Sequence, residues 1–193
     1  MGAKFANIQI RESNLSLVEI ALKKYLENSE KDKESIGYFL RKQHKTDTFY
    51  IGQVNRNWIT ILHSALEWGN VSQFAYEFSQ YYKGVIMAVG YYDDDVLGIC
   101  IVKDEELLTQ HVSGEGADYY AAGEEFGNVD VLIKELNLDT NSDELKNVLQ
   151  MTELDDKVKK LEKSFNTLLW IKVDWLNNLD EHIRNKFKAI KID

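Results

Sequence analysis

The sequence predicts an α+β fold, in which a largely antiparallel sheet is built from two helix–three-strand repeats and followed by a helical C-terminal region. Short strand-like segments separated by turn residues fill the first two thirds of the chain, and the order helix–strand–strand–strand occurs there twice. Helical spacing of apolar residues dominates the remainder. We therefore expect a duplicated sheet domain over residues 1–127 and a helical region over residues 128–193 that packs on it without being independent.

The first repeat follows an N-terminal strand. Lys4–Arg11 alternates apolar and polar residues, as a strand does when its two faces differ. A helix should run from a cap at Asn14 or Ser16 to about Asn28, because its apolar residues recur at spacings of three and four. The other expected elements are strands at Ile36–Lys42, Thr48–Val54 and Trp58–Ser64, with a turn at Asn55–Asn57.

The second repeat begins with a helix from Asn70 to about Tyr82. Three strands should follow, at Val85–Tyr91, Val96–Lys103 and Leu107–Val112. Acidic turns over residues 93–95 and 104–106 separate them, and aspartate is a favoured turn residue in a chain that contains no proline.

The chain after the segment Ser113–Gly127 is expected to be mostly helical. Helical spacing covers three segments, Val129–Leu136, Ser142–Gln150 and Glu153–Leu168. A short helix near Asp174–Arg184 and a last strand at Phe187–Ile192 complete the prediction.

A constant offset of 48 positions relates the second hairpin of the sheet domain to the first. The aligned pairs include Ile51 with Ile99, Ile59 with Leu107 and His63 with His111. We interpret this as a structural duplication. The alternative is that any two hairpins of similar length share an alternation of period two.

The charge balance limits the class of partner. The chain has 193 residues, with 23 lysines and arginines against 32 aspartates and glutamates, for a net charge of −9. Nucleic acids and anionic membranes both attract clustered positive charge, so the composition argues against these two partners. A basic protein is the complementary partner.

Two features indicate a cytoplasmic location. The single cysteine, Cys100, cannot form a disulfide within the chain, which favours a reducing compartment. The N-terminus leads directly into a strand pattern without a signal peptide, and no run approaches 18 apolar residues.

Three sets of residues are candidates for chemistry. Asp93–Asp95 could hold a hard cation, but the spacing of a calcium loop is absent and a hairpin turn is the simpler interpretation. His63 and His111 could form a zinc or general-base site, although neither is part of a ligand motif. Cys100 lies within an apolar segment that is typical of a buried strand. We therefore predict no catalytic, cofactor-binding or metal-binding residues.

The segment Ser113–Gly127 is the predicted contact region for a partner. Its glycines free the backbone, its carboxylates supply charge and its aromatic residues are suited to anchor a protein interface. The alternative is that the aromatic residues fix the loop on the sheet. The candidate contact residues are Glu115, Asp118, Tyr119, Tyr120, Glu124, Glu125 and Phe126.

The stretch from Val71 to Tyr120 resembles a family of bacterial proteins for which no activity is established. The resemblance depends on the aspartate-rich hairpin Tyr92–Gly98 and on the Asp-Tyr-aromatic segment Ala117–Tyr120. The proline usual before that segment is missing here. The resemblance implies a cytoplasmic bacterial protein with a sheet-based domain, and it implies no particular activity.

These observations together predict a non-catalytic, acidic module that binds a basic protein partner, for example as an immunity-type inhibitor of a basic toxin. Two alternatives stay open. One is a hydrolase in which His63, His111 or Asp93–Asp95 share a pocket, and the other is a small-ligand sensor with a cleft between the two repeats.

Overall fold

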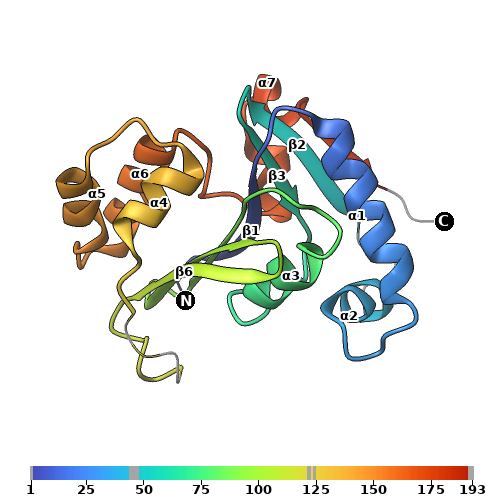
Figure 1. Cartoon of the computed structure of the whole chain (residues 1–193), viewed down its shortest axis with the longest axis horizontal. Helices are drawn as coiled ribbons and strands as arrows, with labels where there is room; N and C mark the ends of the chain where they lie inside the picture. The colour runs from blue at the N-terminus through green and yellow to red at the C-terminus, as the bar shows by residue number, and fades with distance from the viewer. Residues whose placement is uncertain (1, 44–47, 121–122, 124, 191–193) are drawn as a thin grey trace.

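A computed structural model describes residues 2–43, 48–120, 123 and 125–190. Within these ranges the fold is a seven-stranded sheet with helices on both faces (Figure 1), which confirms the predicted α+β class. The strand order is β6-β5-β4-β1-β3-β2-β7, and every neighbouring pair is antiparallel. The strands are β1 (Lys4–Arg11), β2 (Phe49–Asn55), β3 (Trp58–Leu62), β4 (Ile86–Tyr92), β5 (Val96–Lys103), β6 (Glu106–Ser113) and β7 (Phe187–Ile190).

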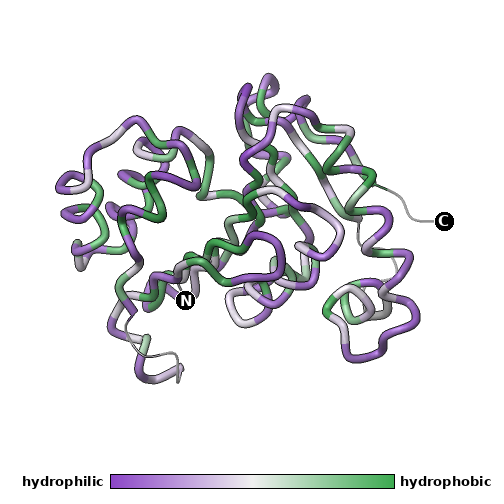
Figure 2. Tube along the Cα trace, in the orientation of Figure 1, coloured by the Kyte–Doolittle hydropathy of each residue, from purple (hydrophilic) through white to green (hydrophobic). Residues whose placement is uncertain are grey.

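The first helical layer covers one face of the sheet. It consists of α1 (Leu15–Ser29), α2 (Ile36–Gln43) and α3 (Val71–Phe78). Ile8 and Ile10 of β1 pack with Leu22 of α1 and Phe74 of α3 in the core of this face. Figure 2 shows the apolar positions of α1 along the side that faces the sheet.

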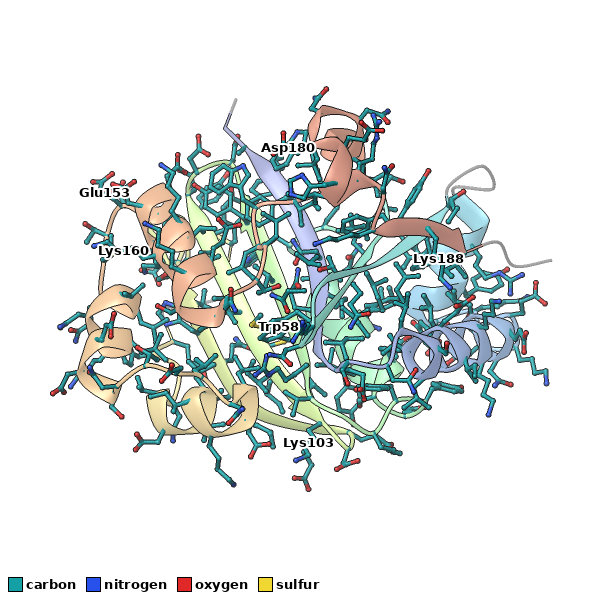
Figure 3. The ribbon with its side chains drawn as sticks, turned by 90° about the horizontal axis from the view of Figure 1, so that it is seen from above. Trp58, Lys103, Glu153, Lys160, Asp180 and Lys188 are labelled. Carbon is teal, nitrogen blue, oxygen red and sulfur yellow. The ribbon has the colours of Figure 1, made fainter. Side chains whose placement is uncertain are left out.

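The second helical layer covers the opposite face. It consists of α4 (Val129–Leu136), α5 (Ser142–Leu149) and α6 (Leu154–Phe165), followed by the 3₁₀ helix η1 (Val173–Asn178) and the short helix α7 (Glu181–Arg184). Trp58 of β3 is buried between the sheet and this layer (Figure 3), and its indole Nε1 donates a hydrogen bond of 2.8 Å to the carbonyl oxygen of Phe165. Phe5, Val89 and Ile99 belong to the same core.

A buried polar network fixes the chain that follows α6 to the centre of the sheet. Gln9 Oε1 accepts hydrogen bonds from the hydroxyls of Thr60 and Thr167. Asn7 Nδ2 donates to the carbonyl oxygens of Leu169 and Ile171. Because buried polar groups are costly when unpaired, this network sets where the chain leaves α6 and crosses β1.

The segment Ile36–Lys42, predicted as a strand, begins the helix α2 instead. The hydroxyl of Ser35 accepts from the backbone N–H of Tyr38, and Glu77 of α3 accepts from that of Ile36, so two side chains cap the first turn. Leu40 then lies one turn after Ile36 on the side that joins the core. The apolar run is too short to distinguish the periodicity of a helix from that of a strand, and the two capping side chains favour the helix.

The predicted repeat is wrong because the first unit contains two helices and two strands. The offset of 48 relates the hairpin β2–β3 to the hairpin β5–β6, but the two hairpins join the sheet by different strands. The first hairpin pairs with β1 through its second strand, β3. The second hairpin pairs with β4 through its first strand, β5. Ile51 consequently faces the first helical layer and its match Ile99 the second. The offset reflects the shared period of two.

The remaining predicted elements are present with shifted ends. The predicted helix Glu153–Leu168 ends at Phe165, because Asn166 takes a left-handed φ of 51° and caps α6. The predicted helix Asp174–Arg184 is divided into η1 and α7. The predicted strand Phe187–Ile192 corresponds to β7, which pairs with β2, and its last two residues lie outside the described ranges.

None of the helices in the described ranges combines the length and the apolar character that crossing a membrane requires.

Candidate binding cleft

A cleft of about 900 Å³ lies where the end of β6 meets the connection between α5 and α6. This volume is within the usual range of about 300–1,000 Å³ for ligand sites. The cleft is therefore not located between the two predicted repeats. Its lining residues are Asp94, Asp95, His111, Val112, Ser113, Gly114, Glu115, Glu125, Phe126, Leu149, Gln150, Met151, Thr152, Glu153, Leu154 and Lys157.

The chain turns outward at Gly114 and then returns beside β6. Gly114 has a φ of +121°, and a Cβ atom there would lie 2.2 Å from the carbonyl oxygen of Asp95, so this turn requires glycine. On the return, Val112 and Glu125 exchange two backbone hydrogen bonds of 2.7 and 3.0 Å. The side chains of residues 125 and 126 are thereby placed at the cleft.

The exposed lining residues form an acidic rim, which we define as Asp94, Asp95, Glu115, Glu125 and Glu153. Within the described part of the chain, none of these carboxylates forms an ion pair. Only the Asp94 side chain accepts a hydrogen bond there, from the backbone N–H of Ala3. The rim therefore presents negative charge to solvent, and none of it is held in an ion pair among the described residues.

The buried polar residues of the cleft form its inner wall, which we define as His111, Ser113 and Lys157. They are 2%, 9% and 1% exposed, respectively. Lys157 Nζ donates a hydrogen bond of 2.7 Å to Ser113 Oγ. Ser113 and His111 lie two residues apart on β6 and face the second helical layer, opposite Leu97 and Ile99 of β5. Lys157 comes from α6, so the inner wall forms where α6 packs against the edge of the sheet.

His111 is neutral near pH 7. Burial and the charge of Lys157 lower the pKa of its imidazole to about 4. Its Nδ1 accepts a hydrogen bond of 3.4 Å from the backbone N–H of Gly127, which assigns the proton of the neutral ring to Nε2. Among the residues that the structure describes, His111 Nε2 is the one buried side-chain nitrogen or oxygen without a hydrogen-bond partner. Leaving such a group unpaired costs about 1–3 kcal/mol.

The predicted contact residues fall into two groups. Glu115, Glu125 and Phe126 line the cleft, and Phe126 is 48% exposed beside the ring of His111. Asp118 and Tyr119 lie on the loop between Glu115 and Glu125, and both are exposed, Tyr119 to 86%. Tyr120 instead packs against Trp68 and Tyr92, and Glu124 lies outside the described residues.

His63 does not share this cleft with His111. It lines a separate cavity of about 130 Å³ at the end of β3, together with Lys4, Trp68 and Lys172. Three strands, β5, β4 and β1, lie between β6, which carries His111, and β3, which ends next to His63. The two histidines are matched by the offset of 48 positions in the sequence, but they do not form a common site in the structure.

The remaining candidates for chemistry, Asp93–Asp95 and Cys100, belong to a turn and to a buried strand. Asp93 and Asp94 take left-handed φ values of 58° and 63° in the β4–β5 turn, which confirms the turn. Their side chains accept hydrogen bonds from the backbone N–H groups of Gly2 and Ala3 and so hold the start of β1. Cys100 is buried within β5, and burial raises the pKa of its thiol. The described residues contain no group of three or more histidine, cysteine, aspartate or glutamate side chains arranged to hold a metal ion.

Sequence reasoning missed Ser113 as a polar site residue and missed Lys157 entirely. A signal for Lys157 was present, because it lies three residues after Leu154 and one before Val158, within the buried stripe of an amphipathic helix. A lysine on such a stripe must find polar partners. Its partner Ser113 is 44 positions away, beyond the reach of local patterns.

Comparison with known proteins gives no relative: no protein-family profile, curated protein or solved structure matches the chain. The resemblance of Val71–Tyr120 to a bacterial family therefore stays a prediction.

Proposed function

We propose that this protein binds a basic protein partner through the acidic rim of the cleft. The observation that carries the proposal is the charge of the exposed lining, where five carboxylates border one cleft and none forms an ion pair among the described residues. Negative charges around one cleft attract a cationic ligand, which also reduces the repulsion between them. The net charge of −9 adds a long-range attraction that speeds encounter with a basic protein.

Apolar side chains next to the rim support a protein partner rather than a small inorganic cation. Phe126, Met151 and Leu154 line the same cleft as the carboxylates. The methylene stems of lysine and arginine pack on apolar surface while their charged ends reach polar groups. A basic side chain of a partner therefore matches both parts of the lining. Tyr119 is exposed on the loop between Glu115 and Glu125, two residues that line the cleft, and would add contact area for a partner.

The test is the binding of an acetylated and amidated hexa-arginine peptide, followed by fluorescence anisotropy at 50 and 300 mM NaCl. The double variant Glu115→Gln, Glu125→Gln removes two rim charges and keeps side-chain shape. Two exposed ion pairs contribute about 0.2–1 kcal/mol each, so we expect binding about 2- to 30-fold weaker than for the unmodified protein. We also expect affinity to fall at the higher salt concentration.

A matched control removes the same charge on the other side of the sheet. Glu27 at the end of α1 and Glu34 before α2 are exposed, so Glu27→Gln, Glu34→Gln should reduce binding much less. Equal losses in the two double variants would show that net charge alone attracts the peptide. That result, or no binding at either salt concentration, would reject the proposed function.

Hydrolysis is a second candidate function, favoured by the contact between Ser113 and Lys157. A serine hydroxyl 2.7 Å from an amine in a cleft has the spacing of a serine–lysine nucleophile pair. A screen of p-nitrophenyl esters tests it. Turnover that disappears in Ser113→Ala and in Lys157→Met would support hydrolysis, and no turnover above the buffer rate would exclude it for these esters.

A further inference from the structure

The inner wall of the cleft has the opposite chemistry to its rim. The rim carries carboxylates, whereas His111, Ser113 and Lys157 present hydrogen-bond donors and a positive charge. The two sets also differ in burial, since the rim residues are exposed and all three inner residues are 9% exposed or less. A ligand that fits the whole cleft therefore needs two chemically different ends.

His111 identifies what the inner end requires. Its Nδ1 accepts from Gly127, so its Nε2 carries a proton, and no described residue accepts a hydrogen bond from it. Buried donors in native proteins are normally paired, and an exception at a cleft points to a group that arrives with a ligand. The missing partner is a hydrogen-bond acceptor.

Ser113 and Lys157 add to the same requirement. Ser113 Oγ accepts from Lys157 Nζ, so the hydroxyl proton of Ser113 is directed elsewhere as a donor. Lys157 brings a positive charge to a place from which water is largely excluded, where an anion is bound more strongly than at the surface. Two donors beside a buried cation are suited to a carboxylate.

We propose that the cleft binds the C-terminal lysine or arginine residue of a partner protein, with its α-carboxylate at the inner wall and its cationic side chain at the acidic rim. This inference rests on the proposed function, because it assigns the chemistry of the basic partner. Phe126 and Leu154, which line the same cleft, supply apolar surface for the methylene stem between the two charged ends.

A chain terminus fits the inner wall better than a free basic amino acid. A free amino acid carries an α-ammonium group next to its carboxylate, which brings a second positive charge close to Lys157. In a peptide the same nitrogen is a neutral amide. The expected ligand is therefore the terminus of a chain, and the free amino acid serves as a comparison in the experiment.

The experiment compares three fluorescein-labelled peptides by anisotropy: Gly-Ala-Gly-Ala-Arg as the free acid, the same peptide as the C-terminal amide, and the free acid Gly-Ala-Gly-Arg-Ala. We expect the first to bind at least tenfold more tightly than either of the others. N-acetylarginine should displace it at lower concentration than free arginine does. Equal displacement by the two would reject the commitment to a chain terminus.

Variants locate the carboxylate. His111→Phe keeps an aromatic ring and removes the donor, so the tenfold preference for the free acid over the amide should fall to about twofold or less. If His111→Phe does not fold, as judged by its melting temperature, Ser113→Ala replaces it, and the preference for the free acid over the amide should fall in this variant too. His182→Phe, on the exposed helix α7, is the matched control and should keep the preference.

The outcomes separate this inference from the proposed function. If the free acid and the amide bind equally and both bind less tightly at high salt, the inference fails and the proposed function stands. If hexa-arginine and all three peptides fail to bind, the proposed function fails and the inference with it. An unchanged preference in both His111→Phe and Ser113→Ala would also overturn the inference.

Discussion

Lys157 of α6 donates a hydrogen bond from Nζ to the hydroxyl oxygen of Ser113 at the end of β6, over 2.7 Å. The contact joins the last strand of the sheet edge to the helical layer that packs on it. Lys157 is only 1% exposed, so its ammonium group cannot simply exchange the hydrogen bond to Ser113 for hydrogen bonds to bulk water. The polar inner wall of the cleft is therefore also part of what holds α6 to the sheet.

The first prediction is that Ser113→Ala lowers the free energy of unfolding by about 1.5–3 kcal/mol, the usual contribution of a hydrogen bond to a charged group. Urea unfolding followed by circular dichroism measures it. Ser142→Ala is the control, because the Ser142 hydroxyl donates to Asp130 on the surface and its loss should cost about 0.5 kcal/mol or less. Equal losses in the two variants would show that the Ser113 contact contributes no more than a surface contact.

The second prediction concerns the pH dependence of stability. The pKa of His111 is lowered to about 4 in the folded protein, against about 6.5 when unfolded. The unfolded state therefore binds the proton first, so stability falls as pH decreases from about 6.5 to 4 and levels off below. A difference of this size corresponds to about 3 kcal/mol.

Comparison with His111→Phe isolates this contribution, because the variant keeps every carboxylate that also titrates in the window. The difference in unfolding free energy between the unmodified protein and the variant should decrease by about 3 kcal/mol from pH 7 to pH 4. Parallel pH profiles for the two proteins would show that His111 has the same pKa folded and unfolded.

How far the sequence predicted this structure depended on whether the signal was local. The alternation of Lys4–Arg11 and the helical stripe of α6 are carried by neighbouring residues, and both elements formed as predicted. The prediction of a strand at Ile36–Lys42 was wrong because one of the side chains that cap the helix α2, Glu77, lies 41 positions from Ile36 and gives no local signal. The order of strands has no local signal, so an offset between two hairpins predicts a repeat even where the hairpins pair differently in the sheet.

The cleft shows the same limit. Glu115, Glu125 and Phe126 were predicted contact residues and line it, because acidic and aromatic residues on a glycine-containing loop favour surface positions. The pairing of Ser113 with Lys157 could not be predicted, since it depends on how α6 crosses the edge of the sheet. Neither could the unpaired state of His111 Nε2, which depends on the return of Gly127 beside β6.

The third prediction tests the close approach of α2 to α1. A Cβ atom on Gly37 would lie 2.6 Å from Cβ and 2.8 Å from Oγ of the buried Ser29. Gly37→Ala should therefore destabilise the fold by about 1–3 kcal/mol, although alanine is the better helix former. Gly69→Ala is the control, because no described atom outside its own chain neighbours lies within 4 Å of the added carbon, and it should change stability by about 1 kcal/mol or less.

The same pair of variants would report a looser arrangement of the two helices. If α2 can move away from Ser29 without loss of its caps, Gly37→Ala would match Gly69→Ala or exceed it in melting temperature. That outcome would show that the contact between α1 and α2 is not close-packed in solution.

The last prediction separates binding from folding in the loop after β6. Tyr119 is 86% exposed, so Tyr119→Ala should leave the melting temperature unchanged while weakening the binding of a basic protein partner. Tyr120 packs edge-on against Tyr92, with ring centroids 5.2 Å apart, and contacts Trp68 at 5.7 Å. Tyr120→Ala should therefore lower the melting temperature by about 2–8 °C.

Differential scanning calorimetry and peptide anisotropy on both variants distinguish the two roles. We expect Tyr119→Ala to lose affinity for the hexa-arginine peptide at an unchanged melting temperature, because the Tyr119 ring packs against Tyr120 and still leaves most of its surface exposed to a partner. Tyr120→Ala should show the reverse order of effects. A fall in melting temperature for Tyr119→Ala as large as that for Tyr120→Ala would mean that both rings fix the loop on the sheet, and Tyr119 would then be removed from the contact surface.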